Sequence, residues 1–382
     1  YAPKYSVSGY IFLEVYMNHE DYMKIALDLA KKGMGYVSPN PMVGAVIVKN
    51  GEIIGKGYHK KCGELHAERN AFANCQKDCS GADIYVTLEP CCHYGKTPPC
   101  TDIIIEKNIK RVFIGSSDPN PKVAGKGVKI LREHGIEVIE NVLKKQCDSL
   151  NEIFFHYITT GKPFVTMKYA MTMDGKIACR TGLSRWITSE TSRQYAQYER
   201  LRHSAIMVGV GTVIADNPML TCRLENGRNP IRIICDTNLR TPVNSEIVKT
   251  AKDIPTIIAT CSNDTEKKSI YINYGCRIMN VNKYDEHIDL NDLMNKLGAE
   301  QIDSILLEGG GELNYSALKS GIVSKVQAYI APKIFGGRDA KTSVMGFGVD
   351  SPDNCYHIEN TTIKNIGDDF LIEGQVKQCS QE

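Results

Sequence analysis

Apolar positions in the first third of the chain switch between helical and strand spacing. Residues 21–32 place apolar side chains at i, i+3, i+4 and i+7, which predicts an amphipathic helix. A β-rich run at 43–49 precedes Asn50-Gly51, a strong hairpin signal, and 52–58 is the returning strand. Helices are then predicted at 66–74, 101–107 and 128–134, and strands at 84–88, 111–115 and 136–139. Strands that alternate with helices predict an α/β layer structure.

The pattern restarts after a break near residue 150. Residues 148–157 predict a connecting helix, and the segment 159–162 before Pro163 reads Thr-Thr-Gly-Lys, which ends it. Later strands are predicted at 164–169, 205–210, 231–236, 256–260 and 304–307, and helices at 189–204, 290–298 and 312–321. We therefore predict two α/β domains, at 17–145 and 163–382, joined by 146–162. Residues 1–16 are expected to be a leader or a cloning remnant.

Composition narrows the possible classes of protein. Forty-six basic and 44 acidic side chains leave a net charge of +2, which gives no general nucleic-acid or anionic-membrane footprint. No stretch approaches the roughly 18 apolar residues of a membrane span. Fourteen cysteines scattered over 382 residues do not resemble a short disulfide-rich scaffold. We expect a cytoplasmic protein without nucleic-acid or membrane partners.

One group of residues has the composition of a catalytic zinc site. His66 lies two residues before Glu68 at the start of a predicted helix, and Cys91 follows Pro90 after a predicted strand. With Cys100, nine positions later, the set offers one imidazole and two thiolates, which suit zinc and leave its fourth position for water. Zinc lowers the pKa of that water to about 7. The pattern is that of a zinc deaminase, with Glu68 as the proton carrier, although eight residues rather than two separate the cysteines.

A structural zinc site is the alternative interpretation. Cys62 or Cys92 could supply a fourth sulfur and close the coordination shell. Glu68 would then have no role, so the catalytic interpretation is favoured.

The second half contains glycine-rich turns between strands and helices. Gly309, Gly310 and Gly311 follow the predicted strand at 304–307 and precede a helix, where backbone N–H groups can approach a phosphate. Residues 208–212 form a similar segment, in which two glycines follow a predicted strand. Neither segment has the Gly-x-Gly-x-x-Gly spacing of a dinucleotide fingerprint, so a tight turn without a ligand is an equal alternative.

Several longer motifs resemble the bifunctional riboflavin-biosynthesis deaminase–reductases. The first-half motifs lie at 38–44, 57–59, 66–68, 87–100 and 118–121, and the second-half motifs at 164–178, 184–188, 209–212, 215–221 and 331–337. The resemblance covers nearly all of 18–375, with the motifs in the same order. Cys92 stands where this family usually has serine. The resemblance implies a cytidine-deaminase-like three-layer domain followed by a dihydrofolate-reductase-like α/β domain.

The resemblance also implies two reactions and their site residues. A phosphorylated, ribosylated diaminopyrimidinone would be deaminated at a zinc site formed by His66, Cys91 and Cys100, with Glu68 catalytic, and NADPH would then reduce the ribosyl group to ribityl. Deaminase substrate contacts would come from Asn40, His59, His93, Lys96, Asp118 and Asn120. NADPH contacts would come from Ala170, Trp186, Thr212, Asp216, Thr237, Gly310, Gly311, Glu312, Leu313, Asn314, Tyr315 and Ser316. Reductase substrate contacts would come from Ser184, Arg200, Leu220, Arg223 and Glu308.

Some of these residues have simpler explanations. Asn40 and Asn120 lie in proline-rich turns that they could cap, and Asp216 could belong to a turn. Trp186 could be a core residue, and Arg200 could lie on a solvated helix face. No residue is an evident proton donor for the reduction.

At the level of function, a broader nucleobase or transfer-RNA deaminase and a zinc-stabilised binding protein are the alternatives. The near-neutral charge and the long Cys91–Cys100 loop argue against the first. We expect a homo-oligomer that acts on a small molecule.

Overall fold

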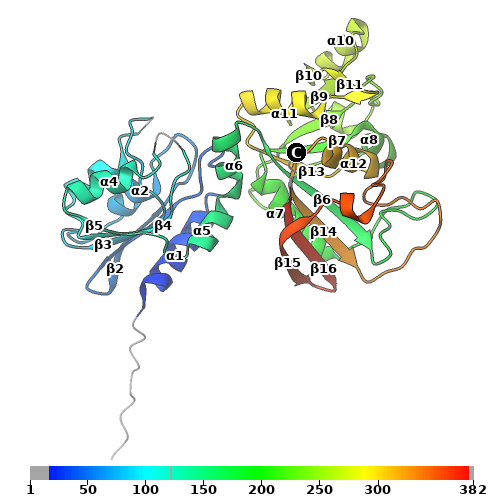
Figure 1. The fold of residues 1–382 in the computed structure, drawn as a ribbon. Helices are drawn as coiled ribbons and strands as arrows, with labels where there is room; N and C mark the ends of the chain where they lie inside the picture. Colours follow the sequence, from blue (N-terminus) through cyan, green and yellow to red (C-terminus); the bar gives the residue numbers. More distant parts are fainter. Residues whose placement is uncertain (1–16, 96, 121–122, 378–382) are drawn as a thin grey trace, which may run out of the picture. The chain divides into compact units, whose positions relative to one another are not determined.

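The computed structural model describes residues 17–95, 97–120 and 123–377, which form two compact units (Figure 1). Within this range, unit 1 comprises 17–33 and 42–150, and unit 2 comprises 34–41 and 151–377. The leader expected at 1–16 lies outside the described residues, and the domain boundaries 17–145, 146–162 and 163–382 stay predictions. No helix in the described ranges combines the length and the apolar character needed to cross a bilayer.

Unit 1 is a five-stranded sheet of order β2-β1-β3-β4-β5 with helices on both faces. β1 is antiparallel to β2 and β3, whereas β3, β4 and β5 run parallel. Its strands are β1 (Gly44–Lys49), β2 (Glu52–Tyr58), β3 (Asp83–Leu88), β4 (Arg111–Ser116) and β5 (Glu137–Ile139). Its helices are α1 (His19–Lys31), α2 (Ala67–Ala73), α3 (Cys100–Glu106), α4 (Lys126–Glu133) and α5 (Lys144–Leu150).

The alternation of side chains along the central strands creates the three layers. Ala45 and Ile47 of β1 enter the core formed with α2, α3 and α4, while Val46 and Val48 enter the core formed with α1 and α5. The predicted hairpin is confirmed, because Asn50 and the glycine after it both adopt positive φ, at 54° and 81°.

Unit 2 is built on a nine-stranded sheet of order β10-β9-β8-β7-β13-β6-β14-β16-β15. The first seven strands in this order, β10 through β14, run parallel to one another. The last two, β16 and β15, add an antiparallel edge. The strands are β6 (Phe164–Thr172), β7 (Ala205–Gly209), β8 (Ile231–Cys235), β9 (Thr256–Thr260), β10 (Arg277–Asn280), β13 (Ser304–Leu307), β14 (Val323–Ala331), β15 (Ile358–Ile366) and β16 (Asp369–Val376). A separate short pair is β11 (Lys283–Tyr284) and β12 (His287–Ile288).

Helices cover both faces of the parallel part of this sheet. α11 and α12 pack on one face through Leu293, Leu297 and Ala317, while α8, α9 and α10 contribute to the core on the other face. The helices are α6 (Glu152–Thr160), α7 (Glu190–Arg202), α8 (Val210–Asp216), α9 (Glu246–Lys249), α10 (Thr265–Asn273), α11 (Leu290–Ala299) and α12 (Gly311–Lys319), with a 3-10 turn η1 (Pro352–Asn354). In such a sheet, ligands bind beyond the carboxyl ends of the strands.

Two features of the chain differ from the sequence-based expectation. The prediction of a single helix at 148–157 is wrong, because the helix is interrupted at Asn151, between α5 and α6. The segment 34–41 belongs to unit 2 although it lies between α1 and β1 in sequence. The Ser38 hydroxyl donates to the Asp303 carboxylate at 2.7 Å, and Arg228 Nε donates to the Gly35 carbonyl at 2.6 Å.

Candidate functional site

The proposed metal ligands of unit 1 converge although they come from three separate segments. His66 is the residue before α2, Cys91 lies just beyond β3, and Cys100 begins α3. His66 Nδ1 lies 3.4 Å from both the Cys91 and the Cys100 sulfur atoms. The Cys100 N–H donates to the Cys91 carbonyl at 3.0 Å, so the backbone itself holds the two cysteines together.

The chemistry and spacing of this cluster fit zinc. Zn–N bonds of about 2.1 Å and Zn–S bonds of about 2.3 Å at tetrahedral angles place such ligand atoms about 3.6 Å apart. The three ligand atoms here lie within 4.8 Å of one another, and among the described residues Cys62 and Cys92 are not members of the group. A three-ligand set of this kind leaves one coordination position for water.

The electrostatics of the cluster favour a thiolate on Cys91. A hydrogen bond from the Cys100 side chain, followed by the interaction with His66, lowers the pKa of Cys91 to about 4. The hydrogen bond to Cys91 also raises the pKa of His66. Thiolate is the form of cysteine that binds metals.

Glu68 lies beside this cluster in a dry environment. Its side chain is in the first turn of α2, and the residue is only 3% exposed. Burial raises the pKa of Glu68, and the neighbouring Cys91 raises it further. A carboxyl group with a raised pKa can both accept and release a proton, as a proton carrier must.

Some of the expected substrate contacts of the deaminase lie around the cluster. His59 is buried, which lowers its pKa, and its ring lies 5.4 Å from that of His66 in an edge-on arrangement. Burial raises the pKa of Asp118 to about 6, and its carboxylate accepts from the Asn120 N–H at 2.8 Å. His93 is exposed and interacts electrostatically with Asp118.

Two expected contacts cannot be placed with this group. Lys96 lies outside the described residues. Asn40 belongs to the segment 34–41, which is part of unit 2. The contacts of all six residues with substrate stay predictions.

Two residues near the cluster escaped the sequence-based interpretation. Glu89 is buried, and its carboxylate accepts from the N–H groups of Gly125 and Gly127 at 3.0 Å each. Arg69 donates to the carbonyls of Pro98 and Pro99 at 3.1 and 2.8 Å. Glu89 therefore fixes the start of the Cys91 loop, and Arg69 fixes its end before Cys100. Their only sequence signal was position, because Glu89 lies inside the motif at 87–100 and Arg69 directly follows the motif at 66–68.

Unit 2 contains a cavity of about 560 Å³ at the carboxyl ends of its parallel strands. The glycine-rich residues Gly310 and Gly311 line it at the start of α12, and Gly209 lines it at the end of β7. The other expected contacts that line this cavity are Ser184, Thr212, Asp216, Thr237, Glu312, Leu313 and Ser316. The start of α12 thus lines the cavity, and the N–H groups at a helix start suit a dinucleotide phosphate.

Four of the expected cofactor contacts are not part of this cavity wall. Asn314 is buried and donates to the Ser343 carbonyl at 2.8 Å. Trp186 is 58% exposed, with the Arg193 guanidinium 4.4 Å from its ring centre, and is therefore not a core residue. Ala170 lies on β6 and Tyr315 on α12. Their contact with a cofactor stays a prediction.

The expected reductase substrate residues include a partly buried ion pair, in which both side chains are 14% exposed. Arg200 of α7 donates twice to the Glu308 carboxylate, at 2.8 and 3.2 Å. Burial opposes the charge on Glu308, but Arg200 and Lys168 lower its pKa to about 2. Arg200 also donates to the Thr221 carbonyl at 2.8 Å, which connects the pair to the segment that carries Leu220 and Arg223.

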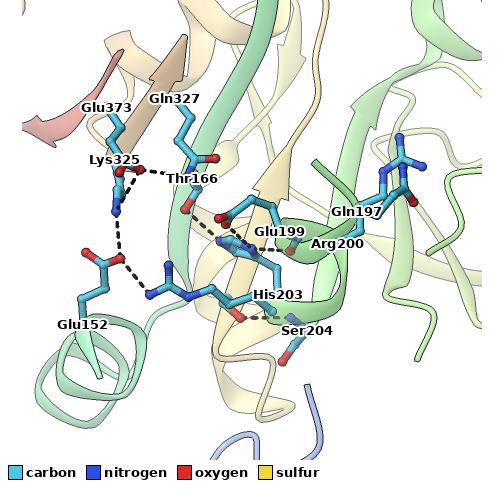
Figure 2. A network of polar contacts seen from close by, with 12 residues as sticks. Glu152, Thr166, Gln197, Glu199, Arg200, His203, Ser204, Lys325, Gln327 and Glu373 are labelled. Carbon is cyan, nitrogen blue, oxygen red and sulfur yellow. Dashed lines mark hydrogen bonds and ion pairs between the residues drawn. The ribbon is translucent and has the colours of Figure 1, made fainter. Parts of the chain in front are cut away.

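A polar network holds the end of α7 that follows Arg200 (Figure 2). His203 Nδ1 donates to the Glu199 carbonyl at 2.8 Å, so its Nε2 accepts from the Thr166 hydroxyl at 2.8 Å. Burial lowers the pKa of His203, which is consistent with this neutral form. Lys325 pairs with Glu152 at 3.0 Å in the same region. Arg200 itself is only 14% exposed and pairs with Glu308, so the solvated-face interpretation is wrong for this residue.

Because Glu89 fixes the Cys91 loop, we predict that Glu89→Ala weakens zinc binding on the order of 10–100-fold, the usual effect of removing a group that orients metal ligands. Competition with a chromophoric chelator measures the affinity. Glu133→Ala, at an exposed glutamate of α4, is the matched control and should change nothing. Unchanged zinc affinity in Glu89→Ala would contradict the role given to this carboxylate.

Comparisons with known proteins match both halves of the chain. Residues 17–116 match the cytidine and deoxycytidylate deaminase zinc-binding region, and residues 163–372 match the RibD C-terminal domain. The riboflavin biosynthesis protein RibD of Actinobacillus pleuropneumoniae is 54% identical over 94% of this chain and 95% of its own. The RibD protein of Bacillus amyloliquefaciens is 42% identical over 92% of this chain and 95% of its own.

Solved structures agree with these matches over 94% of the chain. Acinetobacter baumannii RibD superposes with a TM-score of 0.83 at 32% identity and covers 94% of this chain and 99% of its own. A Thermotoga maritima diaminohydroxyphosphoribosylaminopyrimidine deaminase/5-amino-6-(5-phosphoribosylamino)uracil reductase superposes with a TM-score of 0.79 at 40% identity. The match covers 94% of this chain and 98% of the other. The expected fold class is confirmed. The chain belongs to the RibD family of riboflavin-biosynthesis enzymes, which join a zinc-binding deaminase to an NADPH-dependent reductase.

Proposed function

We propose that this chain deaminates 2,5-diamino-6-ribosylamino-4(3H)-pyrimidinone 5′-phosphate and then reduces the ribosyl group of the product to ribityl. The single observation that carries the first step is the convergence of His66, Cys91 and Cys100 beside a buried Glu68. The name of the Thermotoga maritima relative supports the substrate class and both reactions. Neither a transfer-RNA deaminase nor a zinc-stabilised binding protein is favoured, because whole-length relatives are riboflavin-biosynthesis proteins.

In the deamination, Glu68 moves the proton. Zinc, when held by the three ligands, supplies Lewis-acid activation of water at neutral pH. Glu68 accepts a proton from the attacking water as the new C–O bond forms. It delivers this proton to the exocyclic amino group as the C–N bond breaks, so that ammonia leaves. His59 and Asp118, together with Asn40, His93, Lys96 and Asn120, are proposed to hold the pyrimidine and its phosphate.

In the reduction, the protein positions two reactants and holds their charges. NADPH supplies the hydride that is added to the anomeric carbon of the ribosyl group. The Arg200 guanidinium is already engaged with Glu308. Arg223 is exposed, and within the described residues its guanidinium donates no hydrogen bond, so it is the better candidate for the substrate phosphate.

We propose a cytoplasmic homo-oligomer. All thirteen cysteines in the described ranges are free thiols, which supports a reducing compartment. β15 is an edge strand with exposed apolar residues, among them Ile363 at 68%, and an open edge of this kind can pair with a second copy. Sedimentation velocity of the purified chain tests the assembly, and a monomer at all concentrations would contradict it.

Replacing the proton carrier separates catalysis from metal binding. Glu68→Gln should keep stoichiometric zinc while ammonia release falls by at least about 100-fold, because the amide cannot carry the proton. Metal analysis and an ammonia assay on the same sample measure both effects. Glu106→Gln, at an exposed glutamate of α3, should behave as the parent protein. Loss of zinc in Glu68→Gln would give this carboxylate a structural role instead.

The two reactions should respond separately to a change in unit 2. Arg223→Ala should raise KM for the deaminated substrate on the order of 10–100-fold in the NADPH-oxidation assay, because one charge-assisted contact with phosphate is lost. Ammonia release should not change. Arg338→Ala, which removes an exposed arginine elsewhere in unit 2, is the control. Equal damage to both reactions would contradict separate sites.

A further inference from the structure

The cavity of unit 2 extends across the ends of several neighbouring strands. The order β8-β7-β13-β6 places the strand ends side by side. On the β6 side, Ile177 and Ser184 from the segment after that strand line the cavity. On the β8 side, the lining continues through Thr237 to Arg240, and His287 of β12 also contributes. The cavity therefore has two chemically different ends.

The proposed function determines which end receives which part of NADPH, and the present inference rests on that function. The glycine-rich start of α12, at the centre of the cavity, suits the pyrophosphate. Glu308 follows β13, pairs with Arg200 and interacts electrostatically with Lys168 of β6, so the expected substrate contacts lie on the side of β13 and β6. Hydride transfer requires the nicotinamide on that side. The adenosine half must then extend over the end of β8.

At the β8 end, the cavity presents an arginine without a protein partner. Arg240 is exposed, and its guanidinium makes no hydrogen bond or ion pair within the part of the chain that the structure describes. His287 belongs to the same end because the β11–β12 pair follows β10, which lies beyond β9 from β8 in the sheet order. An unpaired cation at the wall of a cavity is suited to bind an anion.

The carboxylates of Asp216 and Glu312 line the same cavity, but among the described residues neither forms an ion pair with Arg240. Asp236 follows β8, but its carboxylate accepts both the N–H and the hydroxyl of Thr241 at 2.7 Å, and it does not line the cavity. Lys341 lines the cavity on the β6 side, where its carbonyl accepts from the Ile177 N–H at 2.9 Å. The positive charge at the adenosine end therefore comes from Arg240, with His287 as a second donor.

We propose that Arg240 binds the phosphate on the 2′ oxygen of the adenosine ribose and thereby makes the reductase select NADPH over NADH. A guanidinium offers paired N–H donors that match phosphate oxygens. NADH carries a hydroxyl at this position and cannot form the charged contact. Thr237, already expected to contact the cofactor, lies in the same turn three residues before Arg240. The arginine is a specificity-determining residue and takes no part in hydride transfer.

The test measures binding, without turnover, on the full-length chain. Isothermal titration gives dissociation constants for 2′,5′-ADP and 5′-AMP, which differ only by the 2′ phosphate, and for NADPH and NADH. The parent protein should prefer the 2′-phosphorylated ligand of each pair. Arg240→Ala should weaken 2′,5′-ADP and NADPH on the order of 10–100-fold and leave 5′-AMP and NADH within about twofold. Arg240→Lys should restore part of the preference.

Unchanged binding of NADH provides the control for folding of Arg240→Ala, and Arg338→Ala controls for the loss of one positive charge. The inference is overturned if Arg240→Ala keeps the full preference, or if it weakens both members of each pair equally. If the parent protein binds neither NADPH nor NADH, the proposed reductase function fails, and the assignment of Arg240 fails with it. A parent protein that binds both equally refutes the selectivity alone.

Discussion

The convergence of one imidazole and two thiolates at the end of a short buried strand is the constraint on which the first unit depends. The strand β3 must stop before Cys91, α2 must begin just after His66, and α3 must begin at Cys100 for the three ligand atoms to meet. Groups with no direct part in ligation hold this geometry. Glu89 binds the backbone at the start of α4, and Arg69 binds the carbonyls before Cys100. The site is therefore held by several helices and loops that pack on the same face of the sheet.

Both units place their chemistry beyond the carboxyl ends of parallel strands. In the first unit, Cys91 follows β3 and Asp118 follows β4, and in the second, Thr237 follows β8 and Glu308 follows β13. Backbone groups there have no further strand partner and are free to bind ligands. The two units differ in how they stabilise charge. The first concentrates soft donors for a metal, whereas the second pairs Glu308 with Arg200, and Arg223 and Arg240 are the arginines that we propose for phosphates.

Much of this could be predicted from sequence because the signals are local. The β1–β2 hairpin and several strands depend on residues a few positions apart. Each metal ligand lies within a short motif, although His66 and Cys100 are 34 positions apart. Glu89, Arg69 and Arg240 were missed because their roles depend on backbone groups or a cavity formed by distant segments. The strands β15 and β16 were not predicted, since β15 is exposed on nearly all of its residues and lacks an alternating pattern. The placement of 34–41 in the second unit likewise depends on long-range contacts with Asp303 and Arg228.

The coordination shell of zinc in the purified protein tests the central claim most directly. X-ray absorption at the zinc edge counts sulfur and lighter scatterers around the metal. The geometry of His66, Cys91 and Cys100 predicts two sulfur atoms at about 2.3 Å and two nitrogen or oxygen atoms at about 2.0–2.1 Å, one of them from exchangeable water. A shell with three or four sulfur atoms would show a closed structural site and contradict the account.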